Sequence, residues 1–306
     1  MPRHILHVGF PKCGSTALQG WFAAHPDVAF AHSRLTGYYS TVDFARRTAL
    51  GESEPEVIVT SHEDFVVPLA QIPVSEYRPP ADISVQRERV CLRLRDLHPD
   101  ADVLIVTRGY HGVLTSTYAD YVGRGGTLGR AELLGLRGAG QSENDVEATF
   151  DYDAVVSLYE RVFGPERVLV MPYELLRDDP GEFVRQLEER FGVGNSGRIP
   201  ERLRVSISPA ELTWYPRLSR FVHRASAPLG RHRNRVVEMY RVLLKRRKLR
   251  RLAQALARVT PPSMNLPPPK ISSEMLDRFY PRAAQLVARP AYAPYRSEYV
   301  DGTSIS

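Results

Sequence analysis

Residues 5–16 read ILHVGFPKCGST, and this stretch decides how the N-terminal part of the chain folds. Its first six residues form a mostly apolar run that is typical of a buried strand, and the pattern over residues 17–24 favours a helix. A strand that passes through a short loop directly into a helix is a building unit of α/β proteins. The stretch therefore predicts a strand–loop–helix unit, with the loop as the candidate binding element.

The loop between this strand and helix has the composition of a phosphate-binding turn. Gly14 allows the backbone to approach an anion closely, and the N–H groups at the start of the following helix favour negative charge. Lys12 adds a mobile positive charge, while Ser15 and Thr16 add hydroxyl donors. A Walker A loop places its lysine after the last glycine, whereas Lys12 precedes Gly14 by two positions. The loop therefore predicts phosphate binding of a type that differs from Walker A.

Apolar runs and helical patterns continue to alternate through the first two thirds of the chain. Further strands are expected at residues 28–31, 57–60, 103–106 and 168–171. Helices are expected at residues 85–97, 112–122, 153–163 and 180–191. This alternation predicts an α/β fold of the P-loop-NTPase-like kind, with three layers (α/β/α) around a central parallel sheet.

A second phosphate contact is expected after the strand at residues 103–106. This strand runs into Arg108, and Ser116 lies two turns into the helix that follows. Arginine makes bidentate contacts with phosphate oxygens, and a serine at this spacing can reach the same group. A P-loop phosphotransferase instead needs an acidic residue at such a strand end to hold magnesium. Arg108 at this position therefore argues against that class.

Taken together, these residues make the sequence resemble the PAPS-dependent sulfotransferases of the bacterial type, where PAPS is 3′-phosphoadenylyl sulfate. The family's 5′-phosphosulfate loop is matched by Pro11, Lys12, Cys13, Gly14, Ser15 and Thr16. Its 3′-phosphate element, an arginine followed eight positions later by a serine, is matched by Arg108 and Ser116. Residues 168–180 (VLVMPYELLRDDP) match the family's later strand and its YE-L-DP segment. The three matches occur in family order over about residues 4–192.

The resemblance implies transfer of a sulfuryl group from PAPS to an acceptor hydroxyl or amine, with no metal required. It implies that Lys12 stabilises the leaving group and that Tyr173 lies near the adenine. Family members carry a histidine or a glutamate just beyond the third strand as the base, and here His62 and Glu63 are adjacent. The S-x-E pattern of many bacterial members favours Glu63, which we place slightly ahead, and the T-H pattern of cytosolic eukaryotic members favours His62.

Two other functions remain as alternatives at this point. One is a P-loop kinase-like phosphotransferase, against which the position of Lys12 and the missing magnesium-binding carboxylate argue. The other is a non-catalytic nucleotide-binding protein that uses the same loop. For a sulfotransferase, small-molecule, carbohydrate and lipid-like acceptors all fit the sequence.

Composition narrows the class of protein further. The chain has 306 residues, 43% of them hydrophobic, and a net charge of +6, which suits anionic ligands. No helix-turn-helix, RNP or zinc-finger spacing is present, so nucleic-acid binding is not expected. Two cysteines are too few for a disulfide framework or a metal cluster. The sequence shows no signal-peptide pattern and no apolar run of about 20 residues, so a cytoplasmic location is expected.

The character of the sequence changes after residue 200. We expect a PAPS-binding core over residues 1–200 and a helical, basic and proline-rich extension over residues 201–306 that packs on this core. Helices are expected at residues 210–224 and 235–259. The basic run at residues 245–251 is expected to form a solvated face or to contact an acidic acceptor or an anionic membrane surface. Within the core, the glycine-rich residues 123–140 are expected to form a long loop.

Overall fold

The computed structural model describes residues 3–32, 57–66, 83–133, 145–197, 207–261 and 271–300. These residues build a five-stranded, fully parallel sheet with the strand order β2-β3-β1-β4-β5. The strands are β1 (Arg3–Gly9), β2 (Val28–His32), β3 (Val57–His62), β4 (Asp102–Thr107) and β5 (Val168–Pro172). All five predicted strands are present, and the parallel sheet confirms the predicted fold class.

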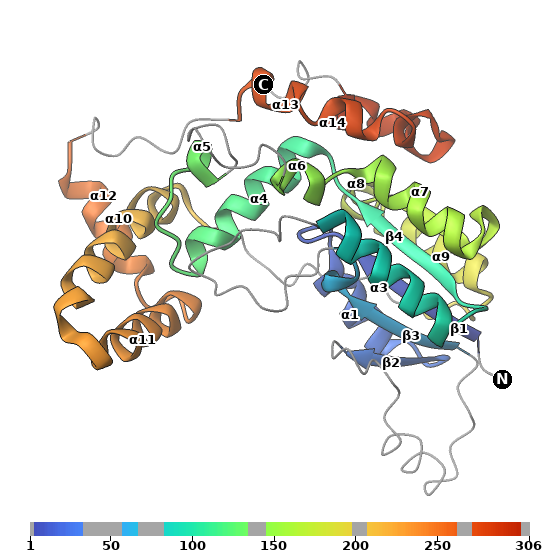
Figure 1. The fold of residues 1–306 in the computed structure, drawn as a ribbon, viewed down its shortest axis with the longest axis horizontal. Helices are drawn as coiled ribbons and strands as arrows, with labels where there is room; N and C mark the ends of the chain where they lie inside the picture. The colour runs from blue at the N-terminus through green and yellow to red at the C-terminus, as the bar shows by residue number, and fades with distance from the viewer. Residues whose placement is uncertain are drawn as a thin grey trace, which may run out of the picture.

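Helices cover both faces of the sheet, which gives the three predicted layers (Figure 1). One face carries α3 (Ile83–Leu97) and α7 (Tyr152–Phe163), and the other carries α1 (Ser15–Ala24) and α9 (Pro180–Phe191). The central strands are therefore buried on both sides, and every residue of β4 is buried. A strand that is buried on both faces has a continuous run of apolar residues, and this is why β4 could be predicted from the sequence.

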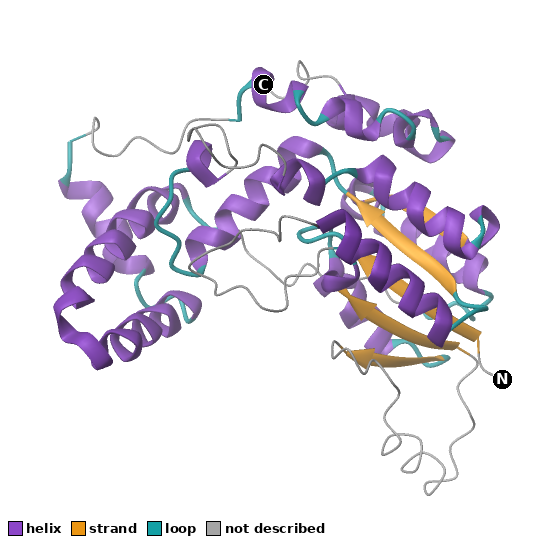
Figure 2. Cartoon of the chain, viewed as in Figure 1, coloured by secondary structure: helices purple, strands orange, loops and turns teal. Residues whose placement is uncertain are grey.

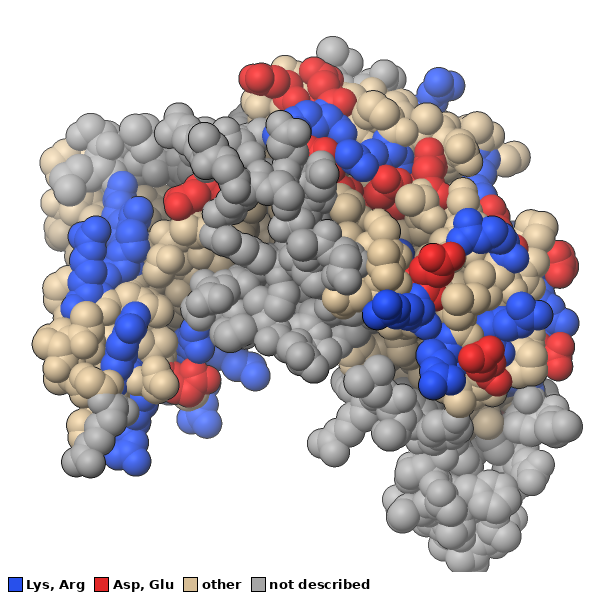
Figure 3. Space-filling view, viewed as in Figure 1, with Lys and Arg blue, Asp and Glu red and all other residues tan. Residues whose placement is uncertain are grey.

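Beyond residue 206 the chain leaves the sheet and forms a separate group of helices (Figure 2). We call residues 207–261 the helical lobe; it contains α10 (Pro209–Ser226), α11 (Arg233–Lys245) and α12 (Arg250–Val259). The lobe packs against α4 (Tyr110–Gly123), and Tyr121, Tyr215, Tyr240 and Leu244 are buried in the core that the lobe and α4 share. Lys and Arg side chains are prominent on the surface of the lobe (Figure 3).

The single helix predicted over residues 235–259 is wrong, because the chain turns between α11 and α12. Arg247 adopts a left-handed conformation with φ = 54°. The backbone N–H groups of Arg247 and Lys248 donate to the carbonyls of Leu244 and Leu243 at 2.8 and 3.0 Å, which ends α11. The turn folds the chain back so that Leu244 of α11 and Ala253 of α12 are buried in the same cluster.

The glycine-rich segment is only partly a loop. A short helix, α5 (Arg130–Leu133), interrupts the long loop predicted over residues 123–140, and residues 134–140 lie outside the described part of the chain. Gly126 lies against the Tyr121 ring, where a Cβ atom would come within 2.1 Å of the ring. The Tyr121 hydroxyl in turn accepts backbone N–H groups from Thr127 and Leu128 at 3.0 and 3.1 Å. A glycine in this segment therefore permits close packing.

The last described segment, residues 271–300, returns to the core (Figure 1). It contains α13 (Ser273–Asp277) and α14 (Arg296–Val300). Tyr292 and Tyr299 are fully buried, and their hydroxyls lie 2.8 and 3.1 Å from Thr107 Oγ1 at the end of β4. The part of the chain beyond residue 200 is thus divided between the helical lobe and the core of the sheet domain.

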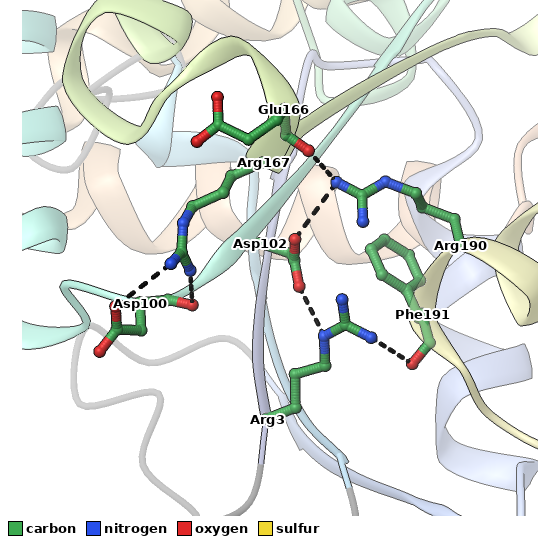
Figure 4. A network of polar contacts seen from close by, with 7 residues as sticks. All are labelled: Arg3, Asp100, Asp102, Glu166, Arg167, Arg190 and Phe191. Carbon is green, nitrogen blue, oxygen red and sulfur yellow. Dashed lines mark hydrogen bonds and ion pairs between the residues drawn. The ribbon is translucent and has the colours of Figure 1, made fainter.

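Charged groups at the amino-terminal edge of the sheet pair with one another (Figure 4). Asp102 is buried at the start of β4, where it lies 2.7 Å from Arg3 Nε and 3.3 Å from Arg190 Nη2. Arg3 also donates to the Phe191 carbonyl at 3.0 Å. This network ties β1, β4 and the end of α9 together, so its charges hold the fold at the edge opposite to the predicted site.

Candidate active site

The predicted site residues lie at or beyond the carboxyl ends of parallel strands, and His62 is the last residue of β3. The phosphate loop follows β1, Glu63 follows β3 and Arg108 follows β4. Tyr173 follows β5 and is the first residue of α8 (Tyr173–Asp178). Strand order places β3 and β4 on either side of β1, so the chain reverses its direction of winding here. Open α/β sheets bind their ligands at this edge, next to such a reversal.

The phosphate loop leaves its helix N-terminus free of a side-chain cap. Gly14 is the N-cap residue of α1 with φ = 87°, and Lys12 also has a positive φ of 67°. A Cβ atom on Gly14 would lie 2.9 Å from the Tyr173 ring, so only glycine fits without displacing that ring. The first-turn N–H groups of Ser15 and Thr16 precede the first intrahelical bond, which Ala17 N–H makes to the Gly14 carbonyl at 2.9 Å. The loop has the features of an anion cradle.

The other two loop residues shape the turn. Pro11 and Cys13 are buried, and the Cys13 thiol donates to the Pro11 carbonyl at a sulfur–oxygen distance of 3.7 Å. Burial raises the pKa of the Cys13 thiol well above its usual range. A neutral, buried thiol is not a nucleophile. Cys13 therefore supports the loop conformation.

Lys12 forms an ion pair that the sequence analysis did not anticipate. Its Nζ atom lies 2.8 Å from Oδ1 of Asp120, and Arg124 Nε lies 2.8 Å from Oδ2 of the same carboxylate. Asp120 belongs to α4 and Arg124 is the C-cap residue of that helix, and they lie four and eight residues beyond Ser116. Residues spaced by four share one face of a helix, so this spacing was the available signal. Asp120 therefore holds the Lys12 ammonium beside the cradle.

Arg108 connects the cradle to α8. Its Nη1 donates to the Lys12 carbonyl at 3.0 Å, and its guanidinium lies 4.6 Å from the centre of the Tyr173 ring. Gly112 makes room for the guanidinium, because a Cβ atom there would lie 2.8 Å from Arg108 Nε. Ser116 is half-buried one turn further along the same helix. Arg108 and Ser116 thus lie on the same side of α4 as Asp120, the residue that contacts Lys12.

A buried carboxylate holds the turn that presents Arg108. Glu174 Oε1 accepts the Gly109 backbone N–H at 3.0 Å, and Oε2 accepts the Tyr299 hydroxyl at 2.7 Å. Gly109 is the N-cap residue of α4. The Tyr152 hydroxyl also donates to the Arg108 carbonyl, at 2.6 Å. Glu174 is the glutamate of the YE-L-DP segment, for which the sequence analysis had no role, and here it positions Arg108.

The two candidate bases have different surroundings. Burial raises the pKa of the Glu63 carboxyl. The charge of Lys12 and the hydroxyl of Ser15 act against this rise in pKa, whereas the charge of Asp120 adds to it. Glu63 therefore shares its electrostatic environment with the cradle. The ring of His62 lies 5.7 Å from the ring of Phe65. His62 is the last residue of β3, and Glu63 begins the short 3-10 helix that follows it.

A buried histidine lies beneath the cradle on β1. His7 Nδ1 is 2.7 Å from Ser61 Oγ, which also accepts from Gln19 Nε2 at 3.1 Å. Burial lowers the pKa of His7 to about 4, so its imidazole is neutral near pH 7. This network joins β1, β3 and α1 directly below Glu63 and Ser15. It therefore supports the geometry of the site without carrying charge.

Two further features bear on the class of site. Among the residues that the structure describes, no three His, Cys, Asp or Glu side chains are grouped so that they could hold a metal ion. In the same part of the chain, no helix has both the length and the apolar character needed to cross a membrane.

Comparisons with known proteins give similar structures but no similar sequences. A sulfotransferase from Alicyclobacillus acidocaldarius is 20% identical, with a TM-score of 0.48, over 72% of this chain and 92% of that chain. Mouse sulfotransferase SULT7A1 complexed with PAP is 14% identical, with a TM-score of 0.34, over 71% of this chain and 63% of that chain. No protein-family model matches the sequence, and no curated protein matches it.

Proposed function

We propose that the protein is a sulfotransferase that moves a sulfuryl group from PAPS to an acceptor hydroxyl or amine and releases 3′-phosphoadenosine 5′-phosphate (PAP). One observation carries the proposal. The uncapped N-terminus of α1 forms an anion cradle beside the Lys12 ammonium, and the half-buried Glu63 carboxyl feels the charge of Lys12. A proton acceptor and a fixed cation therefore meet where a transferred group would sit, which is the arrangement that group transfer between two oxygen atoms needs.

The residues present fit the two phosphate groups of PAPS. The space that a Gly14 Cβ would fill and the uncapped N–H groups of Ser15 and Thr16 suit the 5′-phosphosulfate. Arg108 and Ser116 would hold the 3′-phosphate, since a guanidinium is suited to a doubly charged oxyanion. The Tyr173 ring, which carries the Arg108 guanidinium on its face, would contact the adenine.

In this proposal the chain contributes a base and fixed positive charge. The acceptor oxygen or nitrogen bonds to sulfur while the bond from sulfur to the 5′-phosphate oxygen breaks. Glu63 takes the proton of the acceptor. Lys12 and the N–H groups of the cradle stabilise the charge that develops on the leaving oxygen. Asp120 keeps the Lys12 ammonium within reach of that oxygen through the 2.8 Å ion pair.

The main competing proposal is a phosphotransferase. The Ser15 hydroxyl acts to lower the pKa of the Glu63 carboxyl, and a hydroxyl and a carboxyl together can take part in magnesium binding. Arg108 stands where that class places an acidic residue, and this favours sulfuryl transfer. Magnesium dependence separates the two classes, because a sulfotransferase of this design neutralises charge with Lys12 and the loop alone.

We expect PAP to protect the protein against thermal unfolding without magnesium, and ATP to protect it weakly or not at all. A ligand at about 100 times its Kd stabilises the folded state by about 2.7 kcal/mol. The measurement is a thermal shift with each nucleotide, with and without magnesium, followed by transfer from radiolabelled PAPS to small-molecule, carbohydrate and lipid-like acceptors. Protection by ATP that requires magnesium would favour the phosphotransferase. Protection by PAP without turnover on any acceptor would favour a non-catalytic nucleotide-binding protein.

The 3′-phosphate assignment has its own test. Ser116→Ala and Arg108→Ala should each weaken PAP binding by about tenfold or more, since a charge-assisted phosphate contact is worth about 1.5–3 kcal/mol. Binding of adenosine 5′-phosphosulfate, which lacks the 3′-phosphate, should change little for Ser116→Ala. Calorimetric titration with both nucleotides measures the difference. Thr115→Ala, at the neighbouring position of α4, is the matched control. Equal losses for both nucleotides would show that Ser116 does not recognise the 3′-phosphate.

A further inference from the structure

The helical lobe has a strong excess of positively charged residues. Residues 207–261 contain fourteen Lys and Arg residues and two Glu residues, whereas the whole chain has a net charge of +6. The rest of the chain is therefore net negative. In Figure 3 blue side chains dominate the lobe, while blue and red mix over the sheet domain. Such a separation of charge creates a positive face that attracts anionic surfaces.

The same lobe exposes large apolar side chains. Seven of the ten exposed large hydrophobic residues in the described part of the chain belong to it. They are Phe221, Leu229, Met239, Val242, Leu243, Leu252 and Val259. The exposed fractions of Phe221, Met239 and Val259 are 69, 62 and 79%. Exposed apolar side chains that gather on one element mark an interaction surface, whereas scattered ones do not.

On α11 the exposed apolar residues and the arginines share the outer face. The inner face of α11 consists of Val237, Tyr240 and Leu244, which are buried. Met239 and Val242 lie on the opposite face, with Arg235 and Arg246 at matching helical spacing. The ion pair of Arg241 with Glu238 lies to one side, at 3.3 Å. The outer face of α11 is thus both apolar and basic.

The helix α12 repeats the arrangement. Its inner residue, Ala253, is fully buried, while Leu252 and Val259 are exposed. Arg251 and Arg258 are also exposed and lie beside them, seven residues apart on one face. Two consecutive helices therefore both place apolar side chains between arginines on the surface that faces away from the protein.

We propose that the helical lobe is a docking surface for a bilayer that contains anionic phospholipids. Arginine and lysine attract the headgroups, and the apolar side chains between them insert at the boundary of the acyl chains. Charge complementarity excludes the other simple occupant, a second copy of the lobe, because two surfaces of the same strong charge repel each other. A soluble polyanion would use the arginines but would leave the apolar side chains in water.

The lobe is joined to the site by α4. Gly125, just beyond the end of α4, lies against Arg241, Leu244 and Tyr240 of α11. The same end of α4 provides Asp120, which holds Lys12. The helix that provides Asp120 is therefore in contact with the lobe that we propose to dock. The docking proposal itself does not depend on the proposed function, because it concerns binding alone.

The test uses the full chain and vesicles of two compositions. We expect the protein to sediment with vesicles made of equal parts of phosphatidylcholine and phosphatidylglycerol, and to remain in solution with phosphatidylcholine alone. Binding should weaken as salt is added, because salt screens charges at the surface. Equal binding to both vesicle types, or binding to neither, would contradict the proposal.

Variants of exposed residues separate a membrane from a soluble polyanion. The triple variant Phe221→Asn, Met239→Asn and Val259→Asn should bind the anionic vesicles at least about tenfold more weakly, because it removes the inserted apolar groups. The matched control is Val85→Asn, Leu92→Asn and Leu97→Asn, on exposed positions of α3, which should bind like the wild type. Arg251→Gln with Arg258→Gln should also weaken binding. Undiminished binding by the first triple variant, together with competition by heparin, would assign the surface to a soluble polyanion instead.

Discussion

Replacing Lys12 should lower kcat by about a hundredfold or more, because the ammonium is the charge that stabilises the leaving oxygen. A loss of this kind is worth about 3 kcal/mol in the transition state. Lys12→Gly is the sharper variant, since Lys12 has φ = 67° and glycine adopts that conformation without strain. Relief of this strain offsets part of the loss of the ion pair with Asp120, whose carboxylate keeps its contact with Arg124. We therefore expect a folded protein of near wild-type stability with little activity.

Arg247→Gly is the matched control for this experiment. Arg247 is the other described non-glycine residue with a positive φ, 54°, and it lies in the turn of the helical lobe. The same replacement of a basic residue by glycine should leave kcat on a soluble acceptor unchanged. Steady-state kinetics and urea unfolding of both variants complete the comparison. A Lys12→Gly enzyme with wild-type kcat would remove Lys12 from the mechanism.

The features that sequence reasoning could predict are those that depend on residues close together in the chain. The strand and helix around the cradle follow from local periodicity, and Gly14 and Lys12 follow from the requirements of a tight anion-binding turn. Arg108 and Ser116 could be paired because the family resemblance places a serine eight positions after the arginine, in the helix that follows the strand. These predictions required no knowledge of how distant segments meet.

The features that sequence reasoning missed depend on contacts between distant segments. The contact of Asp120 with Lys12 could not be predicted from the sequence, because the two residues are more than a hundred positions apart and meet only in the folded chain. The role of Glu174 depends on contacts with Tyr299 and Gly109, and these three residues come from three separate parts of the chain. The turn at Arg247 was hidden because the residues on both sides have good helix propensity, and burial against α10 overrode it.

The position of Asp120 also affects the choice of base. Burial raises the pKa of Glu63. Asp120 raises it further and Lys12 lowers it, so the ion pair of Asp120 with Lys12 also affects how readily Glu63 accepts a proton. The ring of His62 lies near the ring of Phe65. We propose Glu63 as the base and keep His62 as the alternative.

Glu63→Gln should lower kcat by about a hundredfold or more and leave PAP affinity unchanged, because the amide keeps the shape but accepts no proton. His62→Asn should have a milder effect and serves as the adjacent control. The two variants are compared by steady-state kinetics and by calorimetric titration with PAP. Full activity of Glu63→Gln beside an inactive His62→Asn would transfer the role of base to His62.

The pH profile gives the same assignment an independent test. A carboxylate base is active when deprotonated, so kcat/KM should fall as the pH decreases through the pKa of Glu63, which burial places above its usual range. Asp120→Asn removes a negative charge that disfavours the ionised form of Glu63 and frees Lys12 to favour it. Both changes lower the pKa of Glu63, so the acidic limb of the profile should move to lower pH in Asp120→Asn. A limb that stays in place in this variant, or moves to higher pH, would mean that the titrating group is not Glu63.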